Sequence, residues 1–332
     1  MANKHKITVL GDGGWGTTLS ILLSRKGFDV CLWGAFKDYI DYIDKKRINV
    51  KFLPGIKIPS SIYITYDLNE ATNFSNDIVL AVPSQYLRSI LKKIKSRNLS
   101  DKLFLSVVKG IEEESLLRMS DVVLGELGKV KLAVLSGPNI SHEIARGMPA
   151  VSVVASKDHD VAKHFQDILM CDSFRIYTNR DVTGVELGGS LKNVIALACG
   201  ISDGLKFGTN AKAALLTRGI VEMARLGVAM GAKRDTFFGI SGLGDLVTTC
   251  CSSSSRNRSV GEKIGRGEKL THVMKHMQMV VEGVTTAKAA YELSKRYKVD
   301  MPITREIYLV LYKNKSPNKA VRDLMSRDKK AE

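Results

Sequence analysis

A lysine stands in an unusual setting in the second half of the chain. Lys192 lies inside the otherwise apolar segment ELGGSLKNVIALACG, shortly after Gly188 and Gly189. A partly buried ammonium loses hydration, which lowers its pKa and suits it to donate a proton. The two glycines are expected to leave room for a ligand. The pattern therefore favours general-acid chemistry at Lys192 over the ordinary interpretation, a surface lysine on a helix.

Polar residues downstream of Lys192 suit a small anionic substrate. Asp245, in GLGD, is expected to orient the lysine and balance its charge. Arg256 offers a planar fork that matches a phosphate group, with Ser255 and Asn257 as further donors. The alternative for SSSSRN is a flexible polar loop, and composition does not separate the two. Glu282, in VVEG, is either a helix cap or a contact to a ribose.

The segment GDGGWG has the spacing G-x-G-x-x-G, directly after the apolar run ITVL and directly before a helical pattern. In this context Gly11 permits a tight turn, Gly13 lets the backbone approach a pyrophosphate, and Gly16 lets the helix pack on the strand. The amides of Gly14 and Trp15 are expected to face the phosphates. The motif predicts dinucleotide binding; the alternative is a glycine-rich turn that only reverses the chain.

The residues after the second strand bear on the choice of cofactor. An NAD site usually has an acid there, which holds the ribose 2′-hydroxyl. Here the strand ends Trp33-Gly34-Ala35, and no acid follows until Asp38. No arginine is present to attract a 2′-phosphate, although Lys37 is close. The motif alone leaves NAD and NADP open.

Strand and helix patterns alternate through the first half of the chain. This alternation predicts a Rossmann-type, doubly wound and mostly parallel sheet. Lys109 follows one expected strand and Gly137 ends the next, so both should lie at the carboxyl edge, where ligands bind. The expected strands are 6–10, 28–33, 62–66, 77–82, 103–108, 132–137, AVSVVAS and FRIYTN; the expected helices are 15–26, one ending near 47, 85–96, 113–127 and 158–170.

Strand patterns almost vanish after about Asn179. Thr183 and Glu186 have the spacing of a capping box that opens a long helix. An amphipathic helix follows, with Ala213, Leu216, Ile220 and Met223 on one face. The fold class is therefore α/β, with a dinucleotide-binding domain at about 1–180 and an all-helical substrate-binding and catalytic domain at about 181–332.

Composition narrows the function classes. The net charge is +16 over 332 residues, but the basic stretches lack interleaved aromatics, so a solvated basic surface is favoured over nucleic-acid binding.

The cysteine count is five, with no Cys-x-x-Cys, which indicates reduced thiols. His272 and His276 are four apart without a third ligand, so no metal is expected. No signal peptide is evident and no stretch approaches the ~18 apolar residues of a membrane span, so an intracellular, soluble protein is expected.

The chain resembles the bacterial-type NAD(P)-dependent glycerol-3-phosphate dehydrogenases. The matching segments occur in family order from residue 11 to about 303, and the series ELGGSLKN, GLGDL and SRN is highly specific. The resemblance implies reversible reduction of dihydroxyacetone phosphate to sn-glycerol 3-phosphate for phospholipid synthesis, with NAD(H) or NADP(H), in a cytoplasmic enzyme that forms a homodimer. The other matching segments are GDGGWGT, FLPG, AVPS, KGIE, SGPN, GVELGGSLKNVIALACGISDGL, NAKAALLTRGIVEMARLG, SSRNRSVG, VVEGVTT and MPI.

By the same resemblance, Lys192 is the general acid/base that protonates the oxygen on carbon 2 of the substrate. The implied substrate-binding set is Lys109, Gly137, Asp245, Ser255, Arg256 and Asn257. The implied cofactor-binding set is Gly11, Gly13, Gly14, Trp15, Gly16, Lys109, Ser141, Arg256, Val280 and Glu282.

The chain departs from the family pattern at three places. Asp12 and Gly14 stand where the family mostly has Ala and Ser, and Ala35 replaces a frequent Arg or His. Asn139 and Ser141 also replace the usual residues. These positions decide contacts to the cofactor, so its identity stays open at this point.

Two other functions compete with this interpretation. One is a related Rossmann-plus-helical reductase that acts on a β-hydroxy acid or ketopantoate, which would not need the phosphate-binding group at Arg256. The other is a basic, cofactor-binding regulator, which would bind nucleic acid with a steep salt dependence and turn over no substrate.

Overall fold

The computed structural model describes residues 5–95, 99–277 and 279–329. The chain divides into two compact units. The first, called here the sheet unit, comprises Met1–Lys109 and Leu117–Glu186; the second, the helical unit, comprises Gly110–Leu116 and Leu187–Glu332. The boundary near 180 expected for two functional domains stays a prediction.

The sheet unit is built on eight strands in the order β10-β9-β8-β7-β6-β1-β2-β5. All neighbours are parallel except β8 and β9. The α/β class with a mostly parallel, Rossmann-like sheet is thus confirmed. The strands are β1 (Lys6–Leu10), β2 (Asp29–Trp33), β5 (Tyr63–Thr65), β6 (Asp77–Leu80), β7 (Leu103–Ser106), β8 (Lys131–Ser136), β9 (Ala150–Ala155) and β10 (Phe174–Asn179).

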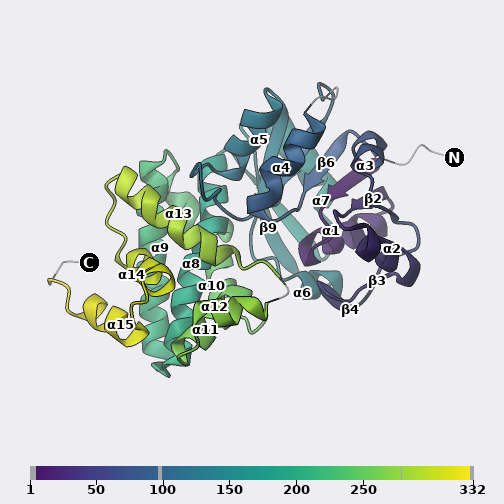
Figure 1. Cartoon of the computed structure of the whole chain (residues 1–332). Coiled ribbons are helices and arrows are strands. Elements are labelled where there is room, and N and C mark those ends of the chain that lie inside the picture. Colours follow the sequence, from purple (N-terminus) through teal and green to yellow (C-terminus); the bar gives the residue numbers. More distant parts are fainter. Residues whose placement is uncertain (1–4, 96–98, 278, 330–332) are drawn as a thin grey trace. The chain divides into compact units, whose positions relative to one another are not determined.

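Helices cover both faces of this sheet, because its strands are apolar on both sides. In β1, Ile7 and Val9 belong to one hydrophobic cluster and Leu10 to the other. The first cluster receives α1 (Gly14–Arg25), α2 (Lys37–Lys46), α6 (Ser141–Ala145) and α7 (His159–Leu169); the second receives α3 (Leu68–Phe74), α4 (Ser84–Ile94) and α5 (Met119–Leu127). Figure 1 shows these helices around the strands.

Three local expectations in the sheet unit need correction. The segment NVKFLPGIKIPS, expected to be irregular, contains the antiparallel pair β3 (Ile48–Asn49) and β4 (Leu53–Lys57). Helix α3 was not expected. Helix α5 begins at Met119 rather than at Glu113, since residues 110–116 belong to the helical unit and take a turn conformation with Leu116 at φ 62°. The expected end of α4 at Ser96 lies outside the described residues.

The helical unit surrounds one long apolar helix, α8 (Val182–Gly204). Its other elements, coloured green to yellow in Figure 1, contain no strand among the described residues. They are α9 (Gly208–Ala229), a short 3-10 turn η1 (Arg234–Phe238), a π-helical turn η2 (Ile240–Gly244), α10 (Asp245–Cys251), α11 (Arg256–Gly265), α12 (Leu270–Lys275), α13 (Glu282–Arg296), α14 (Pro302–Tyr312) and α15 (Pro317–Met325).

Helix α8 is apolar because it forms the core of this unit. Its most apolar 18-residue window reaches a mean hydropathy of 1.2, so the expectation that no stretch approaches a membrane span was wrong on length and composition. That window is entirely buried within the protein. The helix therefore packs against its neighbours instead of against lipid.

The expected capping box at the start of α8 is wrong. The carboxylate of Asp181, not the hydroxyl of Thr183, accepts a hydrogen bond from the N–H of Gly184 at 2.9 Å. Glu186 is buried and accepts hydrogen bonds from the N–H of Ser120 at 2.7 Å and from Arg118 at 2.6 Å. The local cap is therefore Asp181 instead of Thr183, and Glu186 has long-range partners instead of a capping role.

Candidate functional site

The glycine-rich turn joins β1 to α1. Backbone atoms lie so close to Gly11, Gly14 and Gly16 that these positions have no space for a Cβ. Gly11 has φ 131°, and a Cβ there would lie 2.6 Å from the carbonyl of Ala81. A Cβ on Gly16 would lie 1.9 Å from the carbonyl oxygen of Gly11. Gly14 is close to another segment, since its Cβ would lie 2.6 Å from the carbonyl oxygen of Phe52. Only glycine allows the helix to begin this near the strand.

The same turn fits a dinucleotide. A Cβ built on Gly13 meets nothing within 4 Å, so the backbone there is open to a ligand. The first hydrogen bond of α1 runs from the N–H of Thr17 to Gly13, which leaves the N–H groups of Gly14 and Trp15 before it. Amides at a helix N-terminus bind phosphate well. The Nε1 atom of Trp15 is buried and has no hydrogen-bond partner among the described residues.

Ser141 lies beside this turn. Its Oγ is 3.6 Å from the position of a Cβ on Gly14, and its carbonyl oxygen accepts a hydrogen bond from Thr18 at 3.1 Å. Ser141 is the first residue of α6. The structure therefore brings together the five residues of the turn and Ser141, which are far apart in the sequence.

Lys109 and Gly137 form a second group in the sheet unit, beyond the carboxyl ends of β7 and β8. The ammonium of Lys109 donates a hydrogen bond to the carbonyl oxygen of Gly137 at 2.7 Å. Gly137 has φ 155°, and a Cβ there would lie 2.7 Å from the Oγ of Ser152. The lysine is thus held at the edge of the sheet by a backbone that only glycine can form.

Lys192 is buried in α8 and is ion-paired. Lys192 is 6% exposed to solvent and Asp245 is 1% exposed. The ammonium donates hydrogen bonds to the carboxylate of Asp245 and to the Oγ1 of Thr249, the latter at 2.7 Å. A charge this deep is tolerable only when it is paired and hydrogen-bonded. The pairing of Lys192 with Asp245 follows the expectation from the sequence.

Gly188, the first of the two glycines before Lys192, has a different role from the one expected. A Cβ on Gly188 would lie 2.6 Å from the carbonyl oxygen of Ser241 in η2, so protein backbone fills the space that was assigned to a ligand. Gly242 is equally tight, since its Cβ would lie 2.0 Å from the carbonyl oxygen of Phe237. The first contact seats η2 on α8, and the second packs η2 against η1. Because η2 runs into α10, they place Asp245 beside Lys192.

Ser255, Arg256 and Asn257 form the start of α11. The Oγ of Ser255 accepts a hydrogen bond from the N–H of Arg258 at 3.3 Å and so caps the helix. Arg256 is exposed and donates a hydrogen bond to the carbonyl oxygen of Val280 at 2.7 Å. The serine-rich segment is therefore not only a flexible loop, since it ends in a capped helix that presents an arginine to solvent.

Asn257 connects this helix start to the segment around Lys192. Its Nδ2 donates to the Oδ1 of Asn193 at 2.9 Å, and its Oδ1 accepts from the N–H of Gly283 at 2.9 Å. Gly283 follows Glu282, the first residue of α13. The hydrogen bonds of Asn257 thus hold the start of α11 against the neighbours in sequence of Lys192 and Glu282, so its side chain is used largely for positioning.

Two contributors were missed in the sequence. Thr249 is four residues after Asp245 on α10, a spacing that places both side chains on one face of a helix. Asn139 was noted only as a departure from the family, and its Oδ1 accepts a hydrogen bond from Ser152 at 2.6 Å. Its Nδ2 is buried and has no hydrogen-bond partner in the described part of the chain. The spacing could have revealed Thr249, whereas nothing local indicates the partner of Asn139.

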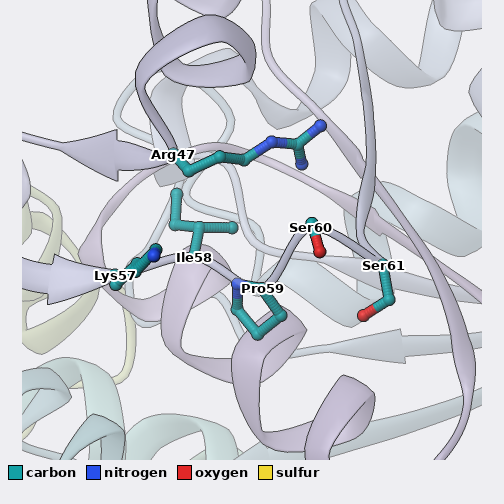
Figure 2. A pocket seen from close by; sticks show the side chains of 6 residues that line it. All are labelled: Arg47, Lys57, Ile58, Pro59, Ser60 and Ser61. Carbon is teal, nitrogen blue, oxygen red and sulfur yellow. The ribbon is translucent and has the colours of Figure 1, made fainter.

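Two hollows in the surface of the described part of the chain lie away from these residues. One, of about 390 Å³, is bordered by residues 57–61 and by Arg47, whose side chain extends along it past Ile58 (Figure 2). The guanidinium of Arg47 already donates to Ile62 at 2.7 Å and to Asp44 at 2.7 Å. A second, of about 310 Å³, is mainly apolar and involves α8, α9, α14 and α15. Neither includes a residue that the sequence assigned to cofactor or substrate.

Comparison with known proteins identifies relatives over nearly the whole chain. Residues 6–162 match the family described as NAD-dependent glycerol-3-phosphate dehydrogenase N-terminus, and residues 181–322 match the corresponding C-terminus family. The NAD(P)+ glycerol-3-phosphate dehydrogenase of Prosthecochloris aestuarii is 48% identical over 98% of this chain and 99% of its own. The Thermoanaerobacter sp. enzyme of the same name is 49% identical over 98% of each chain.

A solved structure agrees with this similarity. The crystal structure of glycerol-3-phosphate dehydrogenase from Coxiella burnetii has a TM-score of 0.94 and 36% identity, and covers 98% of this chain and 99% of that one. The likeness includes both the sheet and the helices that follow it.

Proposed function

Because this chain belongs to the NAD-dependent glycerol-3-phosphate dehydrogenases, we propose that Lys192 is the proton donor of that reaction and that Arg256 binds the phosphate of its substrate. The activity is the interconversion of dihydroxyacetone phosphate and sn-glycerol 3-phosphate with NAD(H) or NADP(H). Family membership excludes a reductase specific for ketopantoate or a regulator without turnover. The observation that carries the proposal is the buried ion pair of Lys192 with Asp245.

When bound, the dinucleotide would supply the hydride that reduces carbon 2 of dihydroxyacetone phosphate, and the residues of the chain would stabilise the charge that develops. Negative charge develops on the carbonyl oxygen as the carbon is reduced. The Lys192 ammonium donates a proton to that oxygen, which gives the hydroxyl of glycerol 3-phosphate. In the reverse direction the neutral amine takes the proton back. Asp245 and Thr249 fix the direction of the ammonium and stabilise its charged form.

The substrate phosphate is assigned to the start of α11. An exposed guanidinium beside a helix N-terminus combines a bidentate donor with a positive dipole, and both favour a phosphate. Ser255 and Asn257 remain the further candidates for substrate contacts in the helical unit, and Lys109 with Gly137 remains the candidate pair of the sheet unit. Val280 and Glu282 are assigned to the cofactor, together with the turn and Ser141.

The proton-donor role is tested with Lys192→Gln, which keeps a long polar side chain but cannot act as an acid. We expect kcat to fall by about 10²–10⁴-fold, the usual contribution of a general acid, while the Kd of NADH stays within about twofold. Steady-state kinetics and fluorescence titration measure the two quantities. Lys295→Gln is the matched control, because Lys295 is 54% exposed and paired with Glu292 on α13.

The glutamine variant leaves the buried Asp245 without its partner, which can impair folding. Thr249→Val therefore serves as a second variant, because it removes one hydrogen bond and retains the ion pair. It should lower kcat by a smaller factor without changing cofactor affinity. Undiminished kcat in a folded Lys192→Gln enzyme would contradict the assignment.

We also propose an assembly state and a compartment for the enzyme. The resemblance to the bacterial enzymes and the free state of Cys31, Cys171, Cys199, Cys250 and Cys251 favour a cytoplasmic enzyme. The same resemblance favours a homodimer, which light scattering coupled to size-exclusion chromatography measures directly.

A further inference from the structure

The adenosine end of the cofactor site lacks the acid that the strand β2 usually supplies. In an NAD site this acid follows the second strand and accepts a hydrogen bond from the ribose 2′-hydroxyl. Here β2 ends at Trp33 and is followed by Gly34 and Ala35. An acid in the same place would have to come from another segment.

Asp12 fills that place. A Cβ built on Gly34 would lie 2.7 Å from the Cγ and 2.9 Å from the Oδ1 of Asp12. The carboxyl group of Asp12, from the glycine-rich turn, therefore lies directly against the residue that follows β2. Its direction is set by the backbone, because the carbonyl oxygen of Asp12 accepts hydrogen bonds from Asn49 at 2.7 Å and from Thr17 at 3.1 Å.

The carboxyl group has an unused acceptor. The Oδ2 of Asp12 is buried and has no hydrogen-bond partner among the described residues. Burial raises the pKa of Asp12, and both its backbone hydrogen bond and the charge of Lys51 oppose this rise. A buried carboxylate oxygen without a donor is unfavourable. A ligand hydroxyl in this position would remove the cost.

Lys37, the first lysine after β2, is already engaged. The ammonium of Lys37 donates to the carboxylate of Asp41 at 2.6 Å and lies 4.9 Å from the centre of the Tyr66 ring. Its charge is balanced within α2. A 2′-phosphate would meet the acid of Asp12 without a free lysine at position 37 to offset the repulsion.

We propose that Asp12 accepts a hydrogen bond from the adenosine ribose of the cofactor and makes the enzyme selective for NAD(H) over NADP(H). The inference rests on the proposed function, since it requires that a nicotinamide dinucleotide binds at this turn.

The test measures cofactor binding rather than turnover. The Kd values of NADH and NADPH are determined by isothermal titration for the wild-type enzyme, Asp12→Asn and Asp12→Ala. The wild type should bind NADH at least about tenfold more tightly than NADPH, the range of one hydrogen bond to a charged group. Both variants should lose most of this ratio, and their affinity for NADPH should rise because the negative charge is gone.

Asp38→Asn is the matched control, since Asp38 is the next acid along the chain and is exposed on α2. It should leave the ratio unchanged. The inference is overturned if the wild type prefers NADPH, if the Asp12 variants weaken both cofactors by the same factor, or if the ratio responds to Asp38 instead. Binding of neither cofactor to the wild type would overturn the proposed function as well, whereas equal binding of both would overturn this inference alone.

Discussion

Lys192 and Arg256 are both cations, but the first is buried and the second is exposed to solvent. Lys192 is buried beside Asp245, so its ammonium is held in one direction and is shielded from water. Arg256 is exposed and hydrogen-bonded to the carbonyl oxygen of Val280, so part of its donor set remains available to a ligand. A proton donor needs a fixed position, and a phosphate-binding group needs access from solvent.

The phosphate assignment predicts the effect of Arg256→Ala. Loss of charged hydrogen bonds to phosphate should lower kcat/KM for dihydroxyacetone phosphate by about 10- to 100-fold, mostly through KM. Arg266→Ala is the control, because Arg266 lies at the other end of α11 and is 64% exposed in a pair with Glu262. Steady-state kinetics with both variants measures the difference. Equal effects of the two substitutions would argue against a specific role of Arg256.

At the scale of elements, the position of α11 depends on contact between helix backbones. A Cβ on Gly200 in α8 would lie 2.0 Å from the carbonyl oxygen of Arg258, and a Cβ on Gly261 in α11 would lie 2.2 Å from that of Leu197. Gly204 and Gly265 repeat the contact one turn further along. Side chains are excluded from this crossing, so the distance between the two helices is set by their backbones.

Gly261→Ala should therefore destabilise the helical unit. The added methyl group meets rigid backbone, and overpacking of this kind costs roughly 1–3 kcal/mol. A shift of α11 would also move Arg256, so KM for the substrate should rise. Chemical denaturation and kinetics measure the two effects.

The control for this prediction is Gly125→Ala. Gly125 lies within α5, and a Cβ there meets nothing within 4 Å. Alanine at such a position should stabilise the protein by roughly 0.5–1 kcal/mol. A neutral or stabilising effect of Gly261→Ala would show that the two helices can separate at little cost.

At the scale of the whole molecule, a buried carboxylate links stability to pH. Glu222 of α9 accepts hydrogen bonds from the N–H groups of Ile303 at 2.6 Å and Thr304 at 3.1 Å, and so caps α14 across the helical unit. Burial raises the pKa of Glu222 to about 7, despite these hydrogen bonds. The folded protein thus binds this proton more tightly than the unfolded chain, whose ordinary pKa is 4.5.

The sign of the pH effect follows from this difference. Between about pH 4.5 and about pH 7 the folded state carries more protons at Glu222, so its contribution to stability falls as the pH rises, by as much as about 3 kcal/mol. Thermal unfolding of the wild type and of Glu222→Gln across this range should give midpoints whose difference changes with pH. Parallel curves would contradict the raised pKa. Glu292→Gln, at an exposed position on α13, is the control.

The sequence alone predicted the strands of the eight-stranded sheet, the glycine-rich turn and the residues proposed here for the site. These patterns are local: alternation of strand and helix signals, glycines at fixed spacing, and a lysine in an apolar segment. The predicted start of a helix at Glu113 and the predicted capping box at Thr183 were wrong, because contacts with distant segments differ from those that the local pattern indicates. The hydrogen bonds of Ser120 and Arg118 to Glu186 are of this kind.

The neighbours of the glycines and acids in the proposed site became known only from the packing of the folded chain. Gly188 faces the backbone of η2 rather than a ligand, and the carboxyl group of Asp12 lies against Gly34, which is 22 positions away in the numbering. Neither neighbour can be inferred from spacing, because both depend on how separate elements pack. The role of a glycine or of an unpaired carboxylate oxygen depends on which atoms lie around it, and those atoms come from segments that only folding brings together.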